Sequence, residues 1–493
     1  MRSIYKNNEK IYIGGYFIDS TILWVFPIII SYAKNRNIKT IVIQDNYSLE
    51  TIQYIKNITP ENIRIIFCKK KYVSLFFSYY LLNLKQFLYF LFIGISLKRS
   101  NLLLSKSWEE TQIKHSIWDS ALLKIKDGQI YPKRLEIFRA SISCSIKFIE
   151  GTYFSKNNVK AAFLGHAVYS TRSFILGLRK HKSDIEIICQ ACECIYKLPP
   201  NRDIYSFVFP LRIWKQILSL QKIQNINKFK SKRVKGISKN FDATYAGKIS
   251  YLNSNEIIKN QIFLHTFKDS PFIVIDEKRI FADYFDWISN TINIIKNSNE
   301  KWNLRIHPGA FKWGEDSTLC LKKILESISI HQLPENITIN SKNSNLEIFK
   351  HCNRVITFSG NAANEAGCFG IKPITISLTP IYSYDKSLVH KPKTIEEYKK
   401  LLLMPSSNKI FSLNKNQINI FWSILFALEE QITIGFDLNA ITLYRSDNTK
   451  KFYKNYMQIK KRISESEKLK KYFIDVGREF ALKNKIISAK SLF

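Results

Sequence analysis

The stretch RVITFSGNAANEAGCFGIKPITI, residues 354–376, shows the unit from which the second half of this chain is built. Apolar residues 354–358 predict a buried strand, followed by a Ser-Gly turn, a helix over 362–369 and another strand over 372–376. A strand, a crossover helix and a second parallel strand form a right-handed unit whose helix covers one face of a sheet. The stretch therefore predicts an α/β domain with a mostly parallel sheet.

The same alternation continues on both sides of that stretch. Toward the amino end, we expect strands at 261–264, 302–306 and 336–339 and helices at 281–296, 318–327 and 345–349. The first half of the chain begins in the same way, with expected strands at 10–13, 40–43, 63–67, 161–164 and 186–188 and an amphipathic helix at 20–34. This rhythm predicts the α/β fold class, with two Rossmann-like domains.

The chain is long enough for two domains, because 493 residues exceed what one hydrophobic core usually organises. Residues 221–240, QKIQNINKFKSKRVKGISKN, are basic and polar with little apolar periodicity, as expected of an exposed connection between domains. We therefore predict an N-terminal domain over 1–235, a second domain over 240–413 and a C-terminal helical tail over 414–493.

The charge of the chain favours anionic partners. There are 75 Lys and Arg against 40 Asp and Glu, a net charge of +35. Nucleotide sugars, phospholipid head groups and acidic polysaccharide would all be attracted by such a field. No RNA-binding or helix-turn-helix signature is present, so we expect no nucleic-acid partner.

The eight cysteines predict neither a disulfide framework nor a metal site. They are scattered too sparsely for a disulfide scaffold in a chain of this size. The one cluster, Cys189, Cys192 and Cys194, has no second ligand pair at metal-finger spacing. We therefore expect reduced thiols, no metal and no cofactor.

The amino terminus has no long apolar segment and no small-residue cleavage site, so we expect a cytoplasmic protein. The apolar segment 72–97 is long enough to span a membrane but is broken near Lys85. We expect a helix that packs on the protein or lies in the membrane interface with Lys98 and Arg99 at its edge. It would then make peripheral contact with an anionic inner membrane.

Polar residues follow three expected strands of the second domain, where ligands bind in parallel sheets. These candidates for nucleotide-sugar binding are His265, Arg305, His307, Ser359, Gly360, Asn361 and Glu365. A Ser-Gly turn at a helix start can hold phosphate on free backbone N–H groups. His307 could bind a phosphoryl oxygen, and Glu365 could accept hydrogen bonds from ribose hydroxyls. The alternative is that Gly360 is an ordinary turn residue and Glu365 a favourable charge at a helix start.

Four motifs together resemble a known family. They are HTFKDSPF (265–272), FADYFDWI (281–288), LRIHPG (304–309) and TFSGNAANEAGCFGIKPITIS (357–377). In this order they resemble the second domain of bacterial capsule and surface-polysaccharide biosynthesis proteins, the group that includes capsule β-Kdo transferases. The resemblance implies a GT-B fold, in which two Rossmann-like domains face each other across a cleft and the second holds the nucleotide.

The same resemblance assigns roles to individual residues. It implies that His307 and Ser359 contact the nucleotide phosphates and that Glu365 contacts the ribose. The chain departs from commoner versions of the last motif in having Asn361 and Asn364 around the helix start.

The acceptor side of such an enzyme would come from the N-terminal domain. Asp19 and His166 follow expected strands there, and either could be the general base that takes the proton from an acceptor hydroxyl. The alternative is that Asp19 caps the following helix and His166 is packed beneath a loop. Tyr169 and Arg172 could hold acceptor groups. Asp119 is a third polar candidate beside Asp19 and His166.

The sequence thus predicts a metal-independent glycosyltransferase. Its donor would be a CMP-, UDP- or GDP-linked sugar, and its acceptor a growing cell-surface polysaccharide or a lipid-linked glycan. Helix dipoles and basic side chains can neutralise a departing nucleotide without a metal, and the chain has no Asp-x-Asp triplet. The alternatives are a nucleotide-sugar epimerase, a polyol-phosphate transferase, and a non-catalytic scaffold for polysaccharide assembly.

Overall fold

The structure is a computed structural model of the 493-residue chain. It describes residues 9–14, 19–44, 47–68, 83–102, 104–125, 129–165, 167–181, 184–191, 194–198, 218–219, 221–236, 258–268, 280–307, 309–310, 314–339, 344–358, 360–376, 386–431, 457, 461 and 465–482.

The first sheet has the strand order β3-β2-β1-β4-β5-β6. Its strands are β1 (Lys10–Gly14), β2 (Thr40–Gln44), β3 (Arg64–Cys68), β4 (Val159–Leu164), β5 (Glu186–Ala191) and β6 (Cys194–Lys197). Neighbouring strands are parallel except β5 and β6, which form an antiparallel pair. That pair carries Cys189 and Cys194, so a β-hairpin accounts for their spacing; Cys192 lies outside the described residues.

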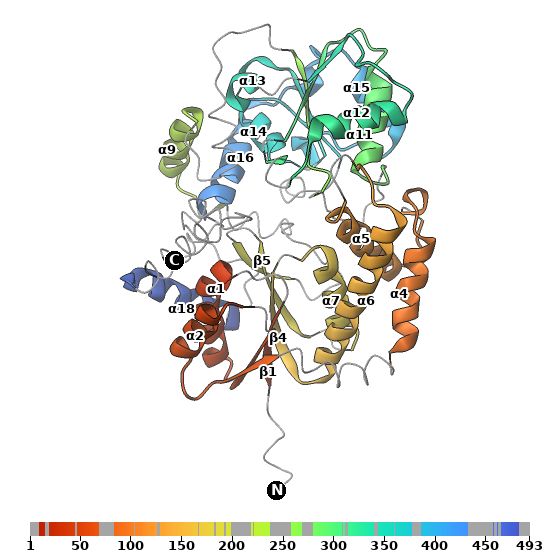
Figure 1. Cartoon of the computed structure of the whole chain (residues 1–493). Coiled ribbons are helices and arrows are strands. Elements are labelled where there is room, and N and C mark those ends of the chain that lie inside the picture. Colours follow the sequence, from red (N-terminus) through yellow and green to blue (C-terminus); the bar gives the residue numbers. More distant parts are fainter. Residues whose placement is uncertain are drawn as a thin grey trace.

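Helices cover both faces of this sheet. They are α1 (Asp19–Asn35), α2 (Leu49–Ile58), α4 (Leu84–Ser96), α5 (Trp108–Leu122), α6 (Arg134–Lys156) and α7 (Tyr169–Arg179). Successive residues of a strand point to opposite faces, so Ile11 and Ile13 pack with α1 whereas Tyr12 packs in the core formed with α5, α6 and α7. Figure 1 shows α1 and α2 on one side of β1 and β4, and α6 and α7 on the other.

The second sheet is wholly parallel, in the order β11-β10-β7-β8-β9. Its strands are β7 (Asn260–Phe263), β8 (Trp302–Arg305), β9 (Ile337–Ile339), β10 (Arg354–Thr357) and β11 (Ile374–Thr375). The helices are α11 (Tyr284–Ile295), α12 (Ser317–Ser327), α13 (Asn345–His351), α14 (Ala362–Cys368) and α15 (Ile395–Leu403). Side-chain caps fix several helix starts; for example, Asp283 Oδ1 accepts a hydrogen bond from Asp286 N at 2.8 Å before α11.

Both sheets have the same core order, in which the first strand lies between the second and the fourth of its own unit. This is the Rossmann order, and it confirms the prediction of an α/β protein with two Rossmann-like domains. The two halves touch where the Arg99 guanidinium lies 4.2 Å from the centre of the Phe285 ring, with Tyr131 5.7 Å from the same ring.

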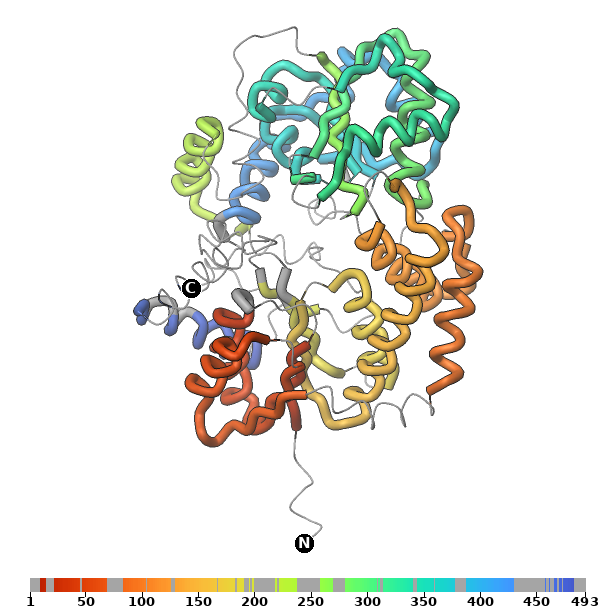
Figure 2. Tube along the Cα trace, in the orientation of Figure 1, coloured from red at the N-terminus to blue at the C-terminus, as the bar shows by residue number. Residues whose placement is uncertain are grey.

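The helical tail contacts both halves of the chain. Its helix α16 (Lys415–Phe426) packs against α14 of the second domain, and α18 (Glu467–Leu482) packs against α1 of the first. Ser31 Oγ on α1 donates a hydrogen bond to the carbonyl oxygen of Ile474 at 2.5 Å. Figure 2 shows this return, with the blue end of the tube lying beside the red start.

Residues 223–234, which lie within the stretch expected to be an exposed connection, form the helix α9 (Ile223–Val234). Only Phe229 and Arg233 of α9 are buried, which explains why no apolar periodicity is visible in the sequence. Phe229 packs edge-on against Phe426, with ring centres 5.5 Å apart. The burial of Arg233 requires ionic partners, which are described below.

The second half of the apolar segment 72–97 forms the helix α4, which begins at Leu84. Residues 69–82 lie outside the described residues. Within the described parts of the chain, we find no helix that is both long and apolar enough to cross a membrane.

Candidate functional site

The candidate site lies at the carboxyl ends of β7, β8 and β10. From β7 the chain moves to β8 on one side and later returns to β10 on the other, so β7 and β10 flank the switch point of the sheet. Ligands of open α/β sheets bind in the crevice outside such a point. His265 and Gly360 follow β7 and β10 within three residues, and His307 follows β8.

Two histidines that lie 42 positions apart in the sequence meet at this edge. The rings of His265 and His307 are stacked, with centres 5.5 Å apart and planes inclined by 27°. Gly309 N donates a hydrogen bond to His307 Nδ1 at 3.0 Å. Since Nδ1 is an acceptor, the proton of the neutral ring sits on Nε2, which can donate to a ligand oxygen. The backbone N–H of His265 donates to the hydroxyl of Tyr284 on α11.

A buried carboxylate fixes the loop that carries His265. Glu315 Oε2 accepts hydrogen bonds from the backbone N–H groups of Phe267 (2.7 Å) and Lys268 (3.1 Å), and Ser317 Oγ donates to Oε1 at 2.9 Å. Burial raises the pKa of Glu315 in spite of these donors. Lys268 Nζ also donates to the carbonyl oxygen of Gly314 at 2.5 Å, so the side chains of Glu315 and Lys268 hold the loops after β7 and β8 to one another.

Arg305 is linked to Glu365 through one amide. Its Nη2 donates to Asn345 Oδ1 at 3.2 Å, and Asn345 Nδ2 donates to Glu365 Oε2 at 3.3 Å. Arg305 is only 6% exposed, and burial lowers its pKa to about 10. It therefore still carries a positive charge at neutral pH.

The other oxygen of Glu365 is bound by Arg233 from α9. Arg233 also donates through Nε to Glu429 Oε1 at 3.2 Å, and all three side chains are buried. Burial alone would lower the pKa of Arg233, but the two carboxylates outweigh it and raise the pKa. Glu365 is thus held by two donors, Arg233 and Asn345, and is only 6% exposed.

The turn after β10 is shaped by a glycine. Gly360 N donates to Thr357 Oγ1 at 3.2 Å, and a Cβ at this position would lie 3.0 Å from that same oxygen. Asn361 is the N-cap of α14, but its side chain accepts from Asn364 Nδ2 at 3.1 Å and not from the helix backbone. Ser359 lies outside the described residues.

The structure places the predicted residues of the first domain less fully. Asp19 begins α1, after β1, but its side chain lies outside the described parts, as does all of His166. Their places in the chain follow β1 and β4, the two strands that flank the switch point of the first sheet. Their roles stay predictions.

Arg172 and Asp119 are interior residues. They form an ion pair at 3.6 Å, and their side chains are 1% and 0% exposed. The expectation that Arg172 holds an acceptor group, and that Asp119 is a third candidate for the base, is therefore corrected: the pair joins α7 to α5. Tyr169, which begins α7, has a φ of +54°.

Sequence reasoning missed Arg233, Asn345 and Glu429. Arg233 stands in a run of basic residues that resembles solvated surface, and Asn345 and Glu429 occur in no motif. A weak signal existed, because Arg233 is the one arginine among the lysines of α9, and arginine is favoured over lysine in buried ion pairs.

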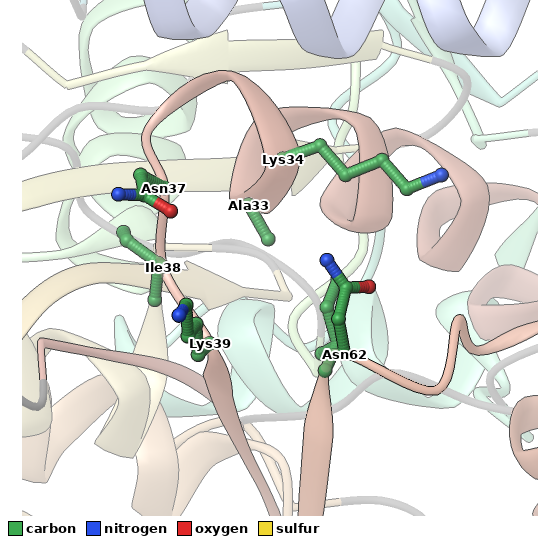
Figure 3. Close-up of a pocket in the computed structure, with 7 residues that line it drawn as sticks. Ala33, Lys34, Asn37, Ile38, Lys39 and Asn62 are labelled. Carbon is green, nitrogen blue, oxygen red and sulfur yellow. The ribbon is translucent and has the colours of Figure 1, made fainter.

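The first domain has a surface depression at the amino ends of β2 and β3. It is lined by Lys34 and Asn37 at the end of α1, Lys39 before β2 and Asn62 before β3. Figure 3 shows these polar side chains around the amino ends of the two strands. Ligands of parallel sheets bind at the carboxyl ends, so this depression is not part of the candidate site.

Among the described residues, no group of three or more His, Cys, Asp or Glu side chains is arranged to hold a metal ion. The structure describes the side chains of six cysteines, and none of these six forms a disulfide.

No protein-family model matches the chain, and no curated protein matches it. Among solved structures, KpsC of Thermosulfurimonas dismutans, a β-Kdo 2,4 transferase, is similar at 9% identity and a TM-score of 0.30, over 56% of this chain and 81% of its own. UDP-GlcNAc 2-epimerase of Methanocaldococcus jannaschii is similar at 12% identity and a TM-score of 0.26, over 84% of this chain and 98% of its own. The calicheamicin glycosyltransferase CalG4 is similar at 8% identity and a TM-score of 0.27, over 90% of this chain and 100% of its own. Similarity at this level does not distinguish one reaction from another.

Proposed function

We propose that this chain is a glycosyltransferase that moves a sugar from a nucleotide-sugar donor to a growing cell-surface polysaccharide or lipid-linked glycan. The observation that supports the proposal is the pair of stacked imidazoles, His265 and His307, at the carboxyl ends of β7 and β8 beside the switch point. The protein would work in the cytoplasm, with peripheral contact to an anionic inner membrane.

In this proposal, the second domain binds the nucleotide. His307 Nε2 donates to a phosphoryl oxygen, and the Ser359-Gly360-Asn361 turn offers the backbone N–H groups of Ser359 and Asn361 to the same phosphates, since Gly360 N donates to Thr357 Oγ1. Glu365, held in place by Arg233 and Asn345, accepts from the ribose hydroxyls. These donors stabilise the negative charge that develops on the departing nucleotide.

The first domain supplies the general base. Asp19 or His166 takes the proton of the acceptor hydroxyl as its oxygen attacks the sugar carbon and the bond to the nucleotide breaks. The proposal needs no metal ion, since imidazole and backbone donors face the leaving group.

An epimerase or a polyol-phosphate transferase would use the same phosphate contacts, because both sheets and their switch points suit any nucleotide-bound substrate. An epimerase would change its sugar nucleotide without an added glycan, whereas a transferase would consume the donor only when an acceptor is present. A non-catalytic scaffold would bind no nucleotide.

Calorimetric titration with CMP, UDP, GDP and CDP tests the nucleotide site. We expect one nucleotide to bind, and both His307→Ala and Glu365→Gln to weaken that binding by about tenfold, the effect of one lost hydrogen bond to a charged group. Gln keeps the size of Glu365 and leaves a neutral partner for Arg233. His331→Ala is the matched control, because His331 is an exposed histidine of the same domain.

The outcomes separate the alternatives. If no nucleotide releases heat on binding, the phosphate-site argument fails and the scaffold becomes the function to pursue. If one nucleotide binds and His331→Ala weakens it as much as His307→Ala, the site lies elsewhere. Product analysis with the matching nucleotide sugar, with and without glycan, then distinguishes transfer from epimerisation.

A further inference from the structure

The helix α4 is apolar on both of its faces. Its inner face is buried: Phe90 packs against Phe148 of α6 with ring centres 5.2 Å apart, and Ile93 and Gly94 are also buried. Gly94 permits the close approach of α6, because a Cβ there would clash with the side chain of Ser141. A helix that is apolar all round is normally covered on every side.

The outer face of α4 is largely exposed. Leu84, Leu88, Phe92 and Ile95 are 49%, 53%, 70% and 64% exposed. Their spacing of three and four residues puts them in one stripe along the helix. Figure 1 shows α4 as the outermost helix on its side of the first domain.

Neighbouring elements extend the apolar surface. Arg134 Nη1 donates to the carbonyl oxygens of Ile95 and Leu97, so the start of α6 lies beside the end of α4. On that first part of α6, Leu135 and Phe138 are 54% and 42% exposed. Exposed apolar side chains gathered on two neighbouring helices are typical of an interaction site.

The charge around this surface is mainly positive. Glu109 and Glu110 lie near Tyr89 of α4 and Glu136 stands between Leu135 and Phe138, but Glu110 pairs with Lys114, and Lys133 and Arg139 are exposed as well. From Asn62 through Trp108 the sequence contains no Asp or Glu, while Lys85 and Lys98 at the two ends of α4 are exposed. Arg99 contributes less, because its guanidinium lies over the Phe285 ring. An apolar stripe with cationic ends complements a surface that is anionic outside and apolar beneath.

We propose that the outer face of α4 binds the surface of an anionic lipid bilayer, with Leu88 and Phe92 inserted among the acyl chains and Lys85 and Lys98 at the head groups. The 13 residues of α4 extend about 20 Å, less than the roughly 30 Å of a bilayer core, so the helix lies in the interface and does not cross it.

A second copy of the chain fits this face less well. In a two-fold dimer the same patch meets itself, so the exposed Lys85 and Lys98 of one copy would face a patch that is itself mainly positive. The like charges would then be brought together. A lipid surface supplies the missing negative charge.

The assignment takes up the peripheral membrane contact of the proposed function, and its test is independent of nucleotide. The full chain is sedimented with vesicles of phosphatidylglycerol and phosphatidylcholine, and with vesicles of phosphatidylcholine alone, at about 0.15 M and about 0.5 M salt. We expect binding to the anionic vesicles that falls as salt rises. Binding measured without nucleotide stays informative even if the titrations above fail.

Two sets of variants locate the surface. The double variant Leu88→Ser with Phe92→Ser should weaken vesicle binding by at least about tenfold. The double variant Lys85→Glu with Lys98→Glu should weaken it by about fivefold for each positive charge that is removed. The control is Leu403→Ser on α15, a leucine that is 46% exposed in the other domain. All these side chains are exposed, so the melting temperatures should match that of the unaltered chain, and light scattering reports the oligomeric state.

Three results would overturn the proposal: no binding to anionic vesicles, an equal loss of binding in Leu403→Ser, or binding that ignores both the charge of the lipid and the salt. A dimer that Leu88→Ser with Phe92→Ser converts to a monomer, without vesicle binding, would assign the face to a second copy instead.

Discussion

Replacing Arg233 by Met should leave two buried carboxylates without their shared cation. Arg233 is 3% exposed, Glu365 is 6% exposed and Glu429 is 7% exposed, so water cannot take the place of the guanidinium. Removing one partner of a buried ion pair costs about 3–5 kcal/mol. Met keeps most of the apolar stem that packs in α9, so the loss reports on the charge and not on a cavity.

The assay is thermal unfolding of the full chain, followed by circular dichroism. For a domain of about 150–250 residues, 1 kcal/mol corresponds to about 2–4 °C in melting temperature, so Arg233→Met should lower it by at least about 6 °C. Adding Glu365→Gln and Glu429→Gln to Arg233→Met removes both uncompensated charges and should restore more than half of the loss.

Two outcomes would refute this reasoning. A melting temperature of Arg233→Met within about 2 °C of the unaltered chain would mean that the ion pairs contribute nothing in solution. A triple variant as unstable as Arg233→Met alone would mean that the loss comes from packing of α9, and not from unpaired carboxylates. The control Lys232→Met removes a neighbouring exposed charge of the same helix and should change little.

Two further predictions concern packing and pH. Gly151→Ala should destabilise the first domain by about 1–3 kcal/mol, because the added Cβ would clash with the backbone oxygen of Phe174 where α6 meets α7. Urea unfolding measures this loss, and an unchanged midpoint would contradict the close contact. Burial raises the pKa of Glu315 above 4.5 in the folded chain, so its contribution to stability is complete below that value and is lost as pH rises through the raised pKa. When the pH of the unfolding experiment is raised from 4.5 to neutral, the free energy of unfolding should therefore fall less for Glu315→Gln than for the unaltered chain. An equal fall in both proteins would exclude Glu315 as the source of the pH dependence.

Local pattern was sufficient for the parallel strands of both sheets. The expected strands at 10–13, 40–43 and 302–306 match β1, β2 and β8 to within one residue at each end, because a buried parallel strand is a short apolar run between turns. The antiparallel strand β6 was not expected, because its four residues are too short a run to predict a strand. The helix α9 was missed because only two of its residues are buried.

The candidate residues of the second domain could be selected from the sequence because parallel sheets place ligands after their strands. The sequence could not show which of these side chains contact one another. His265 stacks on His307 because β7 and β8 are adjacent strands. The ion pair between Arg233 and Glu365 joins residues that are 132 positions apart in the sequence. The roles of these residues in binding stay predictions.

The sequence by itself determined that this protein alternates strands and helices in two α/β halves, because apolar periodicity is local and records which side of each element is buried. Only the tertiary structure decided the strand orders, the partners of Glu365 and Arg172, and the fact that α4 buries one apolar face while the other stays exposed. Periodicity states that a side chain leaves water, but its partner is chosen by the packing of segments that are distant in the chain.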